Sequence, residues 1–177
     1  MQYKRLTHIS TAAVVSIGIL ALLMVSALAC GGKPAPAMTV YYQIGQRAQT
    51  SQEILTIVST EKTPQYPVAG VLNSLLRTWV NAPPTTQFIL VEVAVINIGQ
   101  GGLGVSRNDF SLKDSEGRKY PSVAYKGLDN YADMKLSPGQ TNWGHIAFVV
   151  PDIATGFELS CVLQGSTTIL GVWQLPY

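Results

Sequence analysis

Residues 88–97 read FILVEVAVIN, a run in which Glu92 is the one charged residue. β-branched and aromatic side chains favour a strand, and a strand that is apolar on both faces is typical of the centre of a sheet. We therefore expect residues 87–97 to form a central strand, with Glu92 marking the side that meets water.

Segments in which apolar and polar residues alternate lie on both sides of this run, and clusters of Gly, Pro, Asn and Asp separate them. Residues 113–119, KDSEGRK, are typical of a hairpin turn in which Gly117 adopts a positive φ, and residues 136–140, LSPGQ, are typical of a second turn. The expected strands cover residues 38–44, 53–60, 87–97, 109–113, 118–120, 141–150, 156–164 and 167–174. Seven or eight short strands predict an all-β chain, folded as an antiparallel β-sandwich.

One segment between the second and third expected strands departs from this pattern. Within the proline-bracketed residues 67–84, apolar side chains recur at helical spacing, and they are Leu72, Leu75, Leu76, Trp79 and Val80. We predict a short amphipathic helix over residues 71–80. This helix either covers an open end of the sandwich or presents Leu72, Leu76 and Trp79 to a partner.

Residues 1–30 have the pattern of a bacterial export signal. Lys4 and Arg5 precede an apolar run over residues 12–28, and residues 26–30, SALAC, resemble the lipobox that precedes a lipid-modified cysteine. We predict a signal peptide over residues 1–29, a lipidated Cys30 with a Gly/Pro-rich tether over residues 30–37, and one domain over residues 38–177. An uncleaved transmembrane helix is the alternative.

The charge balance argues against a basic surface for nucleic acid. The chain has 12 Lys and Arg and 10 Asp and Glu residues, and two of the basic residues, Lys4 and Arg5, lie in the leader. The rest of the chain therefore has no net charge, and we expect no nucleic-acid partner.

The residues that usually carry catalysis or bind metals are scarce. His145 is the single histidine beyond the leader, and alternation places it on the outer face of its strand, two positions from Trp143, as an exposed residue. If Cys30 carries a lipid, Cys161 has no partner, and its strand context predicts a buried core residue. We expect no catalytic residues, no metal and no cofactor.

The order of these segments resembles the DUF4352 family. The resemblance covers residues 45–162 and rests on residues 88–97, on NDFSLKDSEGRKY at 108–120, LSPGQ at 136–140, GHIAFVVP at 144–151 and FEL at 157–159. It implies an exported, often lipid-anchored domain with an immunoglobulin-like β-sandwich, similar to that of a mycobacterial antigen. It implies no catalytic or binding residues.

Together these features predict a non-enzymatic binding module, held by the lipid on Cys30 at the outer face of the bacterial cytoplasmic membrane. Its partner would be an envelope protein or an extracellular ligand. The alternative is a domain that binds glycans or the cell wall through aromatic loops, with Tyr125 and Tyr131 as candidate residues beside Trp79 and Trp143.

Overall fold

The computed structural model describes residues 38–68, 78–165 and 169–177. Contacts within the chain divide it into two units, residues 1–36 and 37–177, and every described residue belongs to the second unit. The leader, Cys30 and the tether lie outside the described residues, so the domain boundaries at residues 29 and 37 remain predictions.

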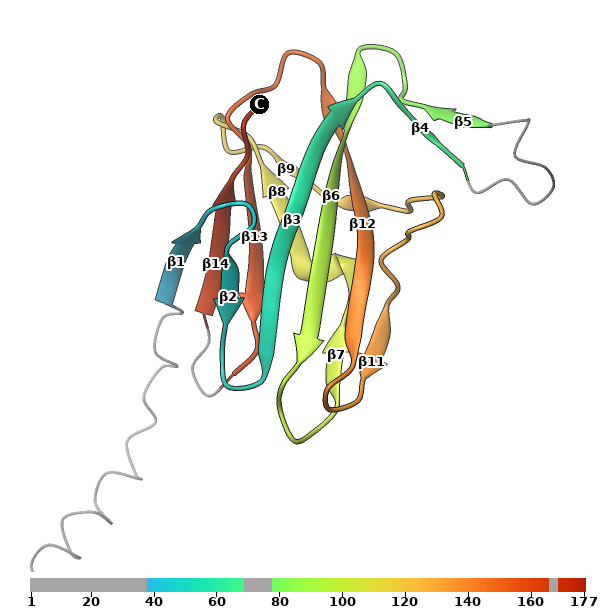
Figure 1. Cartoon of the computed structure of the whole chain (residues 1–177). Helices are drawn as coiled ribbons and strands as arrows, with labels where there is room; N and C mark the ends of the chain where they lie inside the picture. Colours follow the sequence, from blue (N-terminus) through green and yellow to red (C-terminus); the bar gives the residue numbers. More distant parts are fainter. Residues whose placement is uncertain (1–37, 69–77, 166–168) are drawn as a thin grey trace, which may run out of the picture. The chain divides into compact units, whose positions relative to one another are not determined.

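Two five-stranded sheets form this unit (Figure 1). The first, named here the β6 sheet, contains in order β10 (Ser122–Val123), β12 (Thr141–Pro151), β6 (Thr86–Asn97), β3 (Glu53–Thr63) and β2 (Arg47–Gln49). The second, the β13 sheet, contains β1 (Met38–Tyr42), β14 (Ile169–Gln174), β13 (Glu158–Leu163), β8 (Phe110–Lys113) and β9 (Lys119–Tyr120). The unit is therefore an all-β sandwich, as the alternating segments predict.

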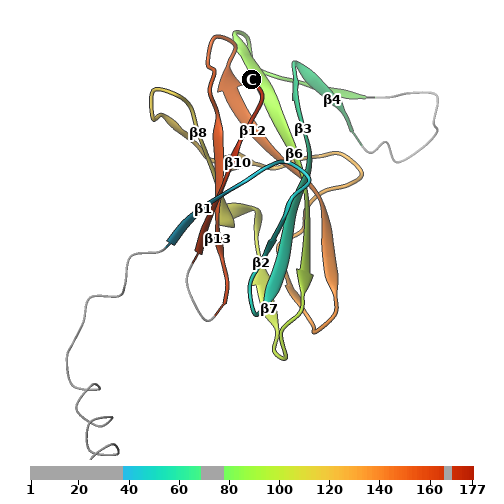
Figure 2. The same cartoon turned by 60° about the vertical axis from the view of Figure 1, so that its left-hand side comes forward.

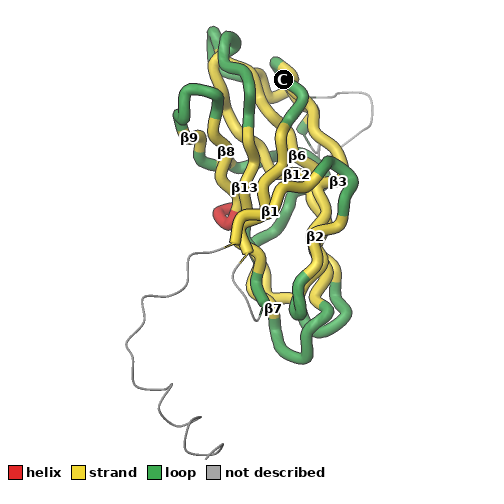
Figure 3. Tube along the Cα trace, turned by 90° about the vertical axis from the view of Figure 1, so that its left-hand side faces the viewer, coloured by secondary structure: helices red, strands yellow, loops and turns green. Residues whose placement is uncertain are grey.

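Two small sheets complete the described part of the unit. One pairs β7 (Leu103–Val105) with β11 (Met134–Leu136), and the other pairs β4 (Gln65–Pro67) with β5 (Trp79–Asn81). The β4–β5 hairpin projects from the end of the β6 sheet at which β3 finishes (Figures 1 and 2). In the part of the chain that Figure 3 colours, helix is confined to one 3₁₀ turn, Arg107–Asp109.

The run at residues 88–97 lies where its composition predicts, because β6 is the middle strand of its sheet. Its inward side chains, among them Val91 and Val93, are fully buried between the two sheets. Its outward side chains Phe88 and Leu90 belong to a second apolar cluster on the other face of the sheet. Phe88 and Leu90 are thus covered on the outer face, which explains why the run is apolar on both sides of the strand at this end.

The main core fills the space between the sheets. Trp173, Phe148 and Phe157 are among its largest side chains, each 0% exposed, and Trp173 stacks on Tyr42 at a centroid distance of 5.3 Å. Cys161 is free, buried and part of this core, which confirms its predicted role.

All eight expected strands occur, as β1, β3, β6, β8, β9, β12, β13 and β14, but the described residues form fourteen strands. The additional strands β2, β4, β5, β7, β10 and β11 have two or three residues each, too few to show a periodic pattern. The pairing is antiparallel between neighbouring strands except for β1, which pairs with β14 in parallel.

The predicted helix over residues 71–80 is wrong at its C-terminal end. Trp79 and Val80 belong to β5, where Val80 lies opposite Tyr66 of β4. In a strand these two neighbours point to opposite sides, and pairing with β4 overrides the helical spacing. Residues 69–77, which include Leu72, Leu75 and Leu76, lie outside the described residues.

Among the residues that the structure describes, no helix has the length and apolar character needed to cross a membrane.

Candidate binding surface

The outer face of the β6 sheet carries a second, smaller apolar cluster. Tyr66, Phe88, Leu90 and Ala147 are buried in it, and partly buried side chains, Tyr125 among them, pack against them. The β4–β5 hairpin supplies Tyr66, and the segment after β10 supplies Tyr125. Residues from distant parts of the sequence therefore meet on this face.

Aromatic rings form a continuous row across this face. Tyr66 contacts Phe88 at a centroid distance of 4.9 Å and Tyr125 at 4.7 Å. Tyr125 lies 5.4 Å from the imidazole of His145, which lies 6.3 Å from the Trp143 ring. We call Phe88, Tyr66, Tyr125, His145 and Trp143 the aromatic row.

A carboxylate fixes one end of the aromatic row. The indole Nε1 of Trp143 donates a hydrogen bond to Oε1 of Glu92 at 3.0 Å. The hydroxyl of Ser59 donates to Oε2 of the same carboxylate at 2.6 Å. Glu92 thus lies on the outer face, as its position in the apolar run predicts, and it orients the half-exposed Trp143 ring.

A pocket of about 570 Å³, named here the outer pocket, opens beside the aromatic row. Parts of β3, β4, β5, β6, β12 and the loop after β10 contribute to its wall. The lining residues are Glu61, Thr63, Pro64, Gln65, Tyr66, Pro67, Trp79, Leu90, Tyr125 and His145. This combination of rings with a few polar groups is typical of a small-ligand site.

A β-bulge decides which residues of β3 face the outer pocket. The pairing of β3 with β6 shifts between Ile57 and Ser59, so that Val58 is the extra residue. Beyond this point Glu61 lies opposite the outward-facing Leu90. Without the bulge, the strict alternation of a strand would turn Lys62 outward instead.

Among the described lining residues, Glu61 is the one Asp, Glu, Lys or Arg side chain. Burial raises the pKa of the Tyr125 hydroxyl, and the charges of Asp129 and Glu61 raise it further. The Nδ1 atom of His145 is buried and has no hydrogen-bond partner in the described part of the chain.

The outer pocket unites two residues that the sequence analysis assigned to different sites. Trp79, predicted for partner binding, and Tyr125, predicted for glycan binding, both line it. Leu72 and Leu76 lie outside the described residues. His145 is on the outer face, as predicted, but it is half-buried instead of exposed because Tyr125 packs over its ring.

The structure corrects the expected exposure of Tyr131. This side chain is 2% exposed and lies in the main core, where its ring packs edge-on against Phe110 at 5.9 Å. The backbone of Tyr131 lies close against Gly144 of β12. A Cβ atom built at Gly144 would lie 2.6 Å from the backbone nitrogen of Tyr131, so this position requires a glycine. Tyr131 is therefore not available to a ligand on the surface.

Sequence reasoning missed the contribution of Tyr66 and Glu61. Neither belongs to a local motif, because the hairpin and the bulge that place them are tertiary features. One signal was present: the apolar outward residues Phe88 and Leu90 indicate that another part of the chain must cover this face.

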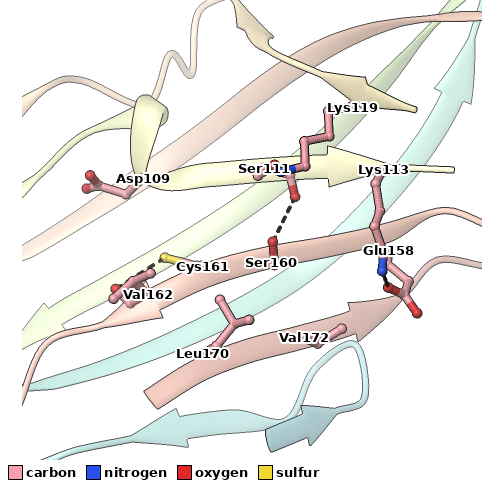
Figure 4. Close-up of a pocket in the computed structure, with 10 residues that line it drawn as sticks. All are labelled: Asp109, Ser111, Lys113, Lys119, Glu158, Ser160, Cys161, Val162, Leu170 and Val172. Atoms are coloured by element: carbon pink, nitrogen blue, oxygen red, sulfur yellow. Dashed lines mark hydrogen bonds and ion pairs between the residues drawn. The ribbon is translucent and has the colours of Figure 1, made fainter. Parts of the chain in front are cut away.

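A second hollow, of about 420 Å³, lies over the β13 sheet (Figure 4). Its charged side chains are of both signs, and Nζ of Lys113 pairs with Oε2 of Glu158 at 2.5 Å. The hydroxyl of Ser160 donates to the carbonyl oxygen of Ser111 at 3.3 Å. Cys161 also lines it, but burial raises the pKa of its thiol well above the ordinary value, so the thiolate is disfavoured.

Within the described residues, no three His, Cys, Asp or Glu side chains lie close enough together to hold a metal ion.

The fold is a β-sandwich of two main sheets, and a second apolar cluster lies on the outer face of the β6 sheet. A family model, described as a domain of unknown function (DUF4352), matches residues 42–168. The chain belongs to this family, which confirms the resemblance.

Solved structures are similar to this chain at low sequence identity. An uncharacterised β-sandwich protein from Clostridium difficile is 16% identical, with a TM-score of 0.53 over 81% of this chain and 99% of that one. A candidate lipoprotein from Bacillus subtilis is 16% identical, with a TM-score of 0.54 over 73% of this chain and 38% of that one. The secreted protein MPT63 from Mycobacterium tuberculosis is 15% identical, with a TM-score of 0.49 over 78% and 99%. A comparison with curated proteins found no match.

Proposed function

We propose that this immunoglobulin-like sandwich is a non-enzymatic, extracytoplasmic binding module that takes its ligand in the outer pocket. The observation that carries the proposal is the convergence of Tyr66, Trp79 and Tyr125 on one pocket. Trp79 is 43% exposed although it is a large apolar side chain, as is common in residues that contact a ligand. The ligand is a small molecule of the envelope or a group on an envelope protein.

The leader supports a location outside the cytoplasmic membrane, with Cys30 as the lipid-modified residue and the membrane as the first partner. The description of the Bacillus subtilis neighbour as a lipoprotein agrees with this location.

The chemistry of the described residues favours binding over catalysis. The buried Cys161 thiol is held in its protonated form by its surroundings. His145 is the one histidine beyond the leader, and its Nδ1 has no orienting carboxylate among the described residues, as a general base of the serine-hydrolase type requires.

Glycan binding is the second candidate. Trp79, Trp143 and Tyr125 present ring surface on or beside the same face, and flat rings pack well against sugars. Because Tyr131 lies in the core, the glycan surface would consist of these three residues alone.

The test compares the full chain with single variants in a nonionic detergent, after circular dichroism has shown that each variant folds. Isolated peptidoglycan and a small-molecule extract of the envelope serve as ligands. We expect Trp79→Ala and Tyr125→Ala to lose binding to the ligand. The control Tyr41→Ala, which removes an exposed aromatic from the other sheet, should bind it as the wild type does. Equal retention by all variants would refute a role for the outer pocket.

A further inference from the structure

The described wall of the outer pocket combines aromatic rings with one charged side chain. Tyr66, Trp79 and Tyr125 supply the rings, and Glu61 supplies the charge. The negative faces of such rings attract a cation, and the attraction grows when the cation leaves water. Rings and a carboxylate on one wall therefore favour the same ligand charge.

The lysine that follows Glu61 in the chain is directed away from the pocket. The bulge in β3 turns Lys62 to the inner side of the sheet, opposite Ile89. There its Nζ donates to the carbonyl oxygens of Asp152 and Ala154, each at 3.2 Å, and lies 5.6 Å from the centre of the Phe157 ring. The Lys62 ammonium is thus engaged by these contacts on the inner side of the sheet, away from the Glu61 carboxylate.

Two more carboxylates lie near residues of the aromatic row. Asp129 lies close enough to Tyr125 to raise the pKa of its hydroxyl, and Glu92 accepts a hydrogen bond from Trp143 at the end of the aromatic row. Among the described lining residues there is no lysine or arginine. The hollow on the β13 sheet has a different charge pattern, because both lysines and carboxylates line it. They are Lys113, Lys119, Asp109 and Glu158.

We propose, on the basis of the proposed function, that the outer pocket binds an organic ammonium group. The rings of Trp79 and Tyr125 contact its alkyl substituents, and Glu61 supplies the counter-charge. A volume of about 570 Å³ exceeds that of the ammonium group, so the rest of the ligand extends toward Thr63 and Gln65. The ammonium group belongs either to a free small molecule or to a lysine side chain of a protein partner.

The experiment titrates the full chain, in a nonionic polyoxyethylene detergent, with three probes. Choline represents a free ammonium compound, Nα-acetyl-lysine amide represents a lysine side chain, and 3,3-dimethylbutan-1-ol has the shape of choline without its charge. Calorimetry gives the affinities, and the indole resonance of Trp79 reports on the site. We expect at least one ammonium probe to bind about ten-fold more tightly than the neutral alcohol.

Matched variants locate the binding. Glu61→Gln removes the charge and Trp79→Leu removes the most exposed ring, and each should weaken ammonium binding by about ten-fold. Glu116→Gln removes an exposed charge in the β8–β9 turn, and Tyr41→Leu removes an exposed ring from the β13 sheet. These two controls should bind as the wild type does.

The outcomes separate this inference from the function on which it rests. Equal affinity for choline and the neutral alcohol would overturn the ammonium assignment and leave an apolar binding pocket. If neither Glu61→Gln nor Trp79→Leu weakens ammonium binding, the assignment to the outer pocket is also overturned, because the ammonium site would lie elsewhere. If neither ammonium probe binds, the inference fails, while loss of the envelope ligand in Trp79→Ala would still uphold the proposed function.

Discussion

At the scale of single residues, Asp114 organises the turn between β8 and β9. Its buried carboxylate accepts hydrogen bonds from the backbone nitrogens of Glu116 and Arg118, from Nε of Arg118 at 2.7 Å and from the Tyr120 hydroxyl at 2.7 Å. Burial alone would raise the pKa of this carboxyl, but the four bonds dominate and lower it from 3.8 to about 2.

This lowered pKa predicts the sign of a pH effect. A carboxyl with a depressed folded-state pKa contributes stability above its ordinary value of 3.8, and the contribution is lost as the pH falls toward about 2. We expect Asp114→Asn to be less stable at pH 7 and to lose much of the pH dependence between these values. Urea unfolding over a pH series measures this, with the exposed Glu116→Gln as control; parallel curves for wild type and Asp114→Asn would contradict it.

For Glu53 we predict a change of stability with pH of the opposite sign to that of Asp114. Its side chain is 4% exposed, and burial raises its pKa above the ordinary 4.5 although the backbone nitrogen of Gln164 donates to it. Stability from this group is therefore greatest below pH 4.5 and falls as the pH rises through the folded-state pKa. Glu53→Gln retains an acceptor for Gln164 and should flatten this fall. A decline as steep as that of wild type in the same unfolding series would argue against it.

The exposures of Tyr131 and Trp79 predict different costs of truncation. Tyr131→Ala removes a ring from the main core and should lower the free energy of unfolding by about 3–5 kcal/mol. Trp79→Ala should cost roughly 1 kcal/mol, because its ring already meets water over 43% of its surface. Chemical denaturation measures both, and similar costs would contradict the assignment of one ring to the core and the other to the pocket.

At the scale of elements, Gly144 controls how the loop before β11 lies against β12. The backbone nitrogen of His145 donates to the carbonyl oxygen of Asp129 at 2.6 Å, and that of Tyr131 donates to the carbonyl oxygen of His145 at 3.2 Å. Gly144→Ala places a methyl group in this contact and should cost about 1–3 kcal/mol while shifting the resonances of Tyr125 and His145.

Gly104 offers the matched control for this substitution. A Cβ atom there meets no neighbour within 4 Å, and its φ is not in the positive region. Gly104→Ala should therefore leave stability within about 0.5 kcal/mol of wild type. Equal losses of stability for Gly144→Ala and Gly104→Ala would show that the loop before β11 does not pack tightly against β12 at Gly144.

The same scale separates what the sequence predicts from what it does not. Long alternating segments and the turns around Gly117 and Gly139, at φ values of 80° and 78°, were predictable, because each depends on local chemistry. Strands of two or three residues have no period of their own. Part of the candidate site was predictable, because Trp79 and Tyr125 stand out as aromatics. Their place in one pocket, however, depends on a hairpin whose Tyr66 packs against Phe88 of β6. The bulge at Val58, which selects Glu61 over Lys62, has no local signature.

At the scale of the whole domain, the two ends of β3 have different neighbours. Met38 begins β1 opposite Ile169, and Gln164, directly after β13, donates a backbone hydrogen bond to Glu53 at the start of β3. Glu61 of the outer pocket lies near the other end, roughly 25 Å along the strand at about 3.3 Å per residue. A chain that enters at Met38 thus enters the domain far from the pocket.

If Cys30 carries the lipid, the short tether brings the Met38 end close to the bilayer, because eight extended residues span at most about 28 Å. We therefore expect the outer pocket to point away from the membrane, open to ligands of the envelope. A fluorophore attached through Gln52→Cys, beside Glu53, should be quenched more strongly by lipid-borne quenchers in vesicles than one attached through Gln65→Cys in β4. The buried Cys161 should not take up the label, and a chain without residues 1–37, which lacks both the leader and Cys30, should show no quenching at either position. Stronger quenching at residue 65 would mean that the pocket end faces the bilayer, and the ligand would then have to come from the membrane itself.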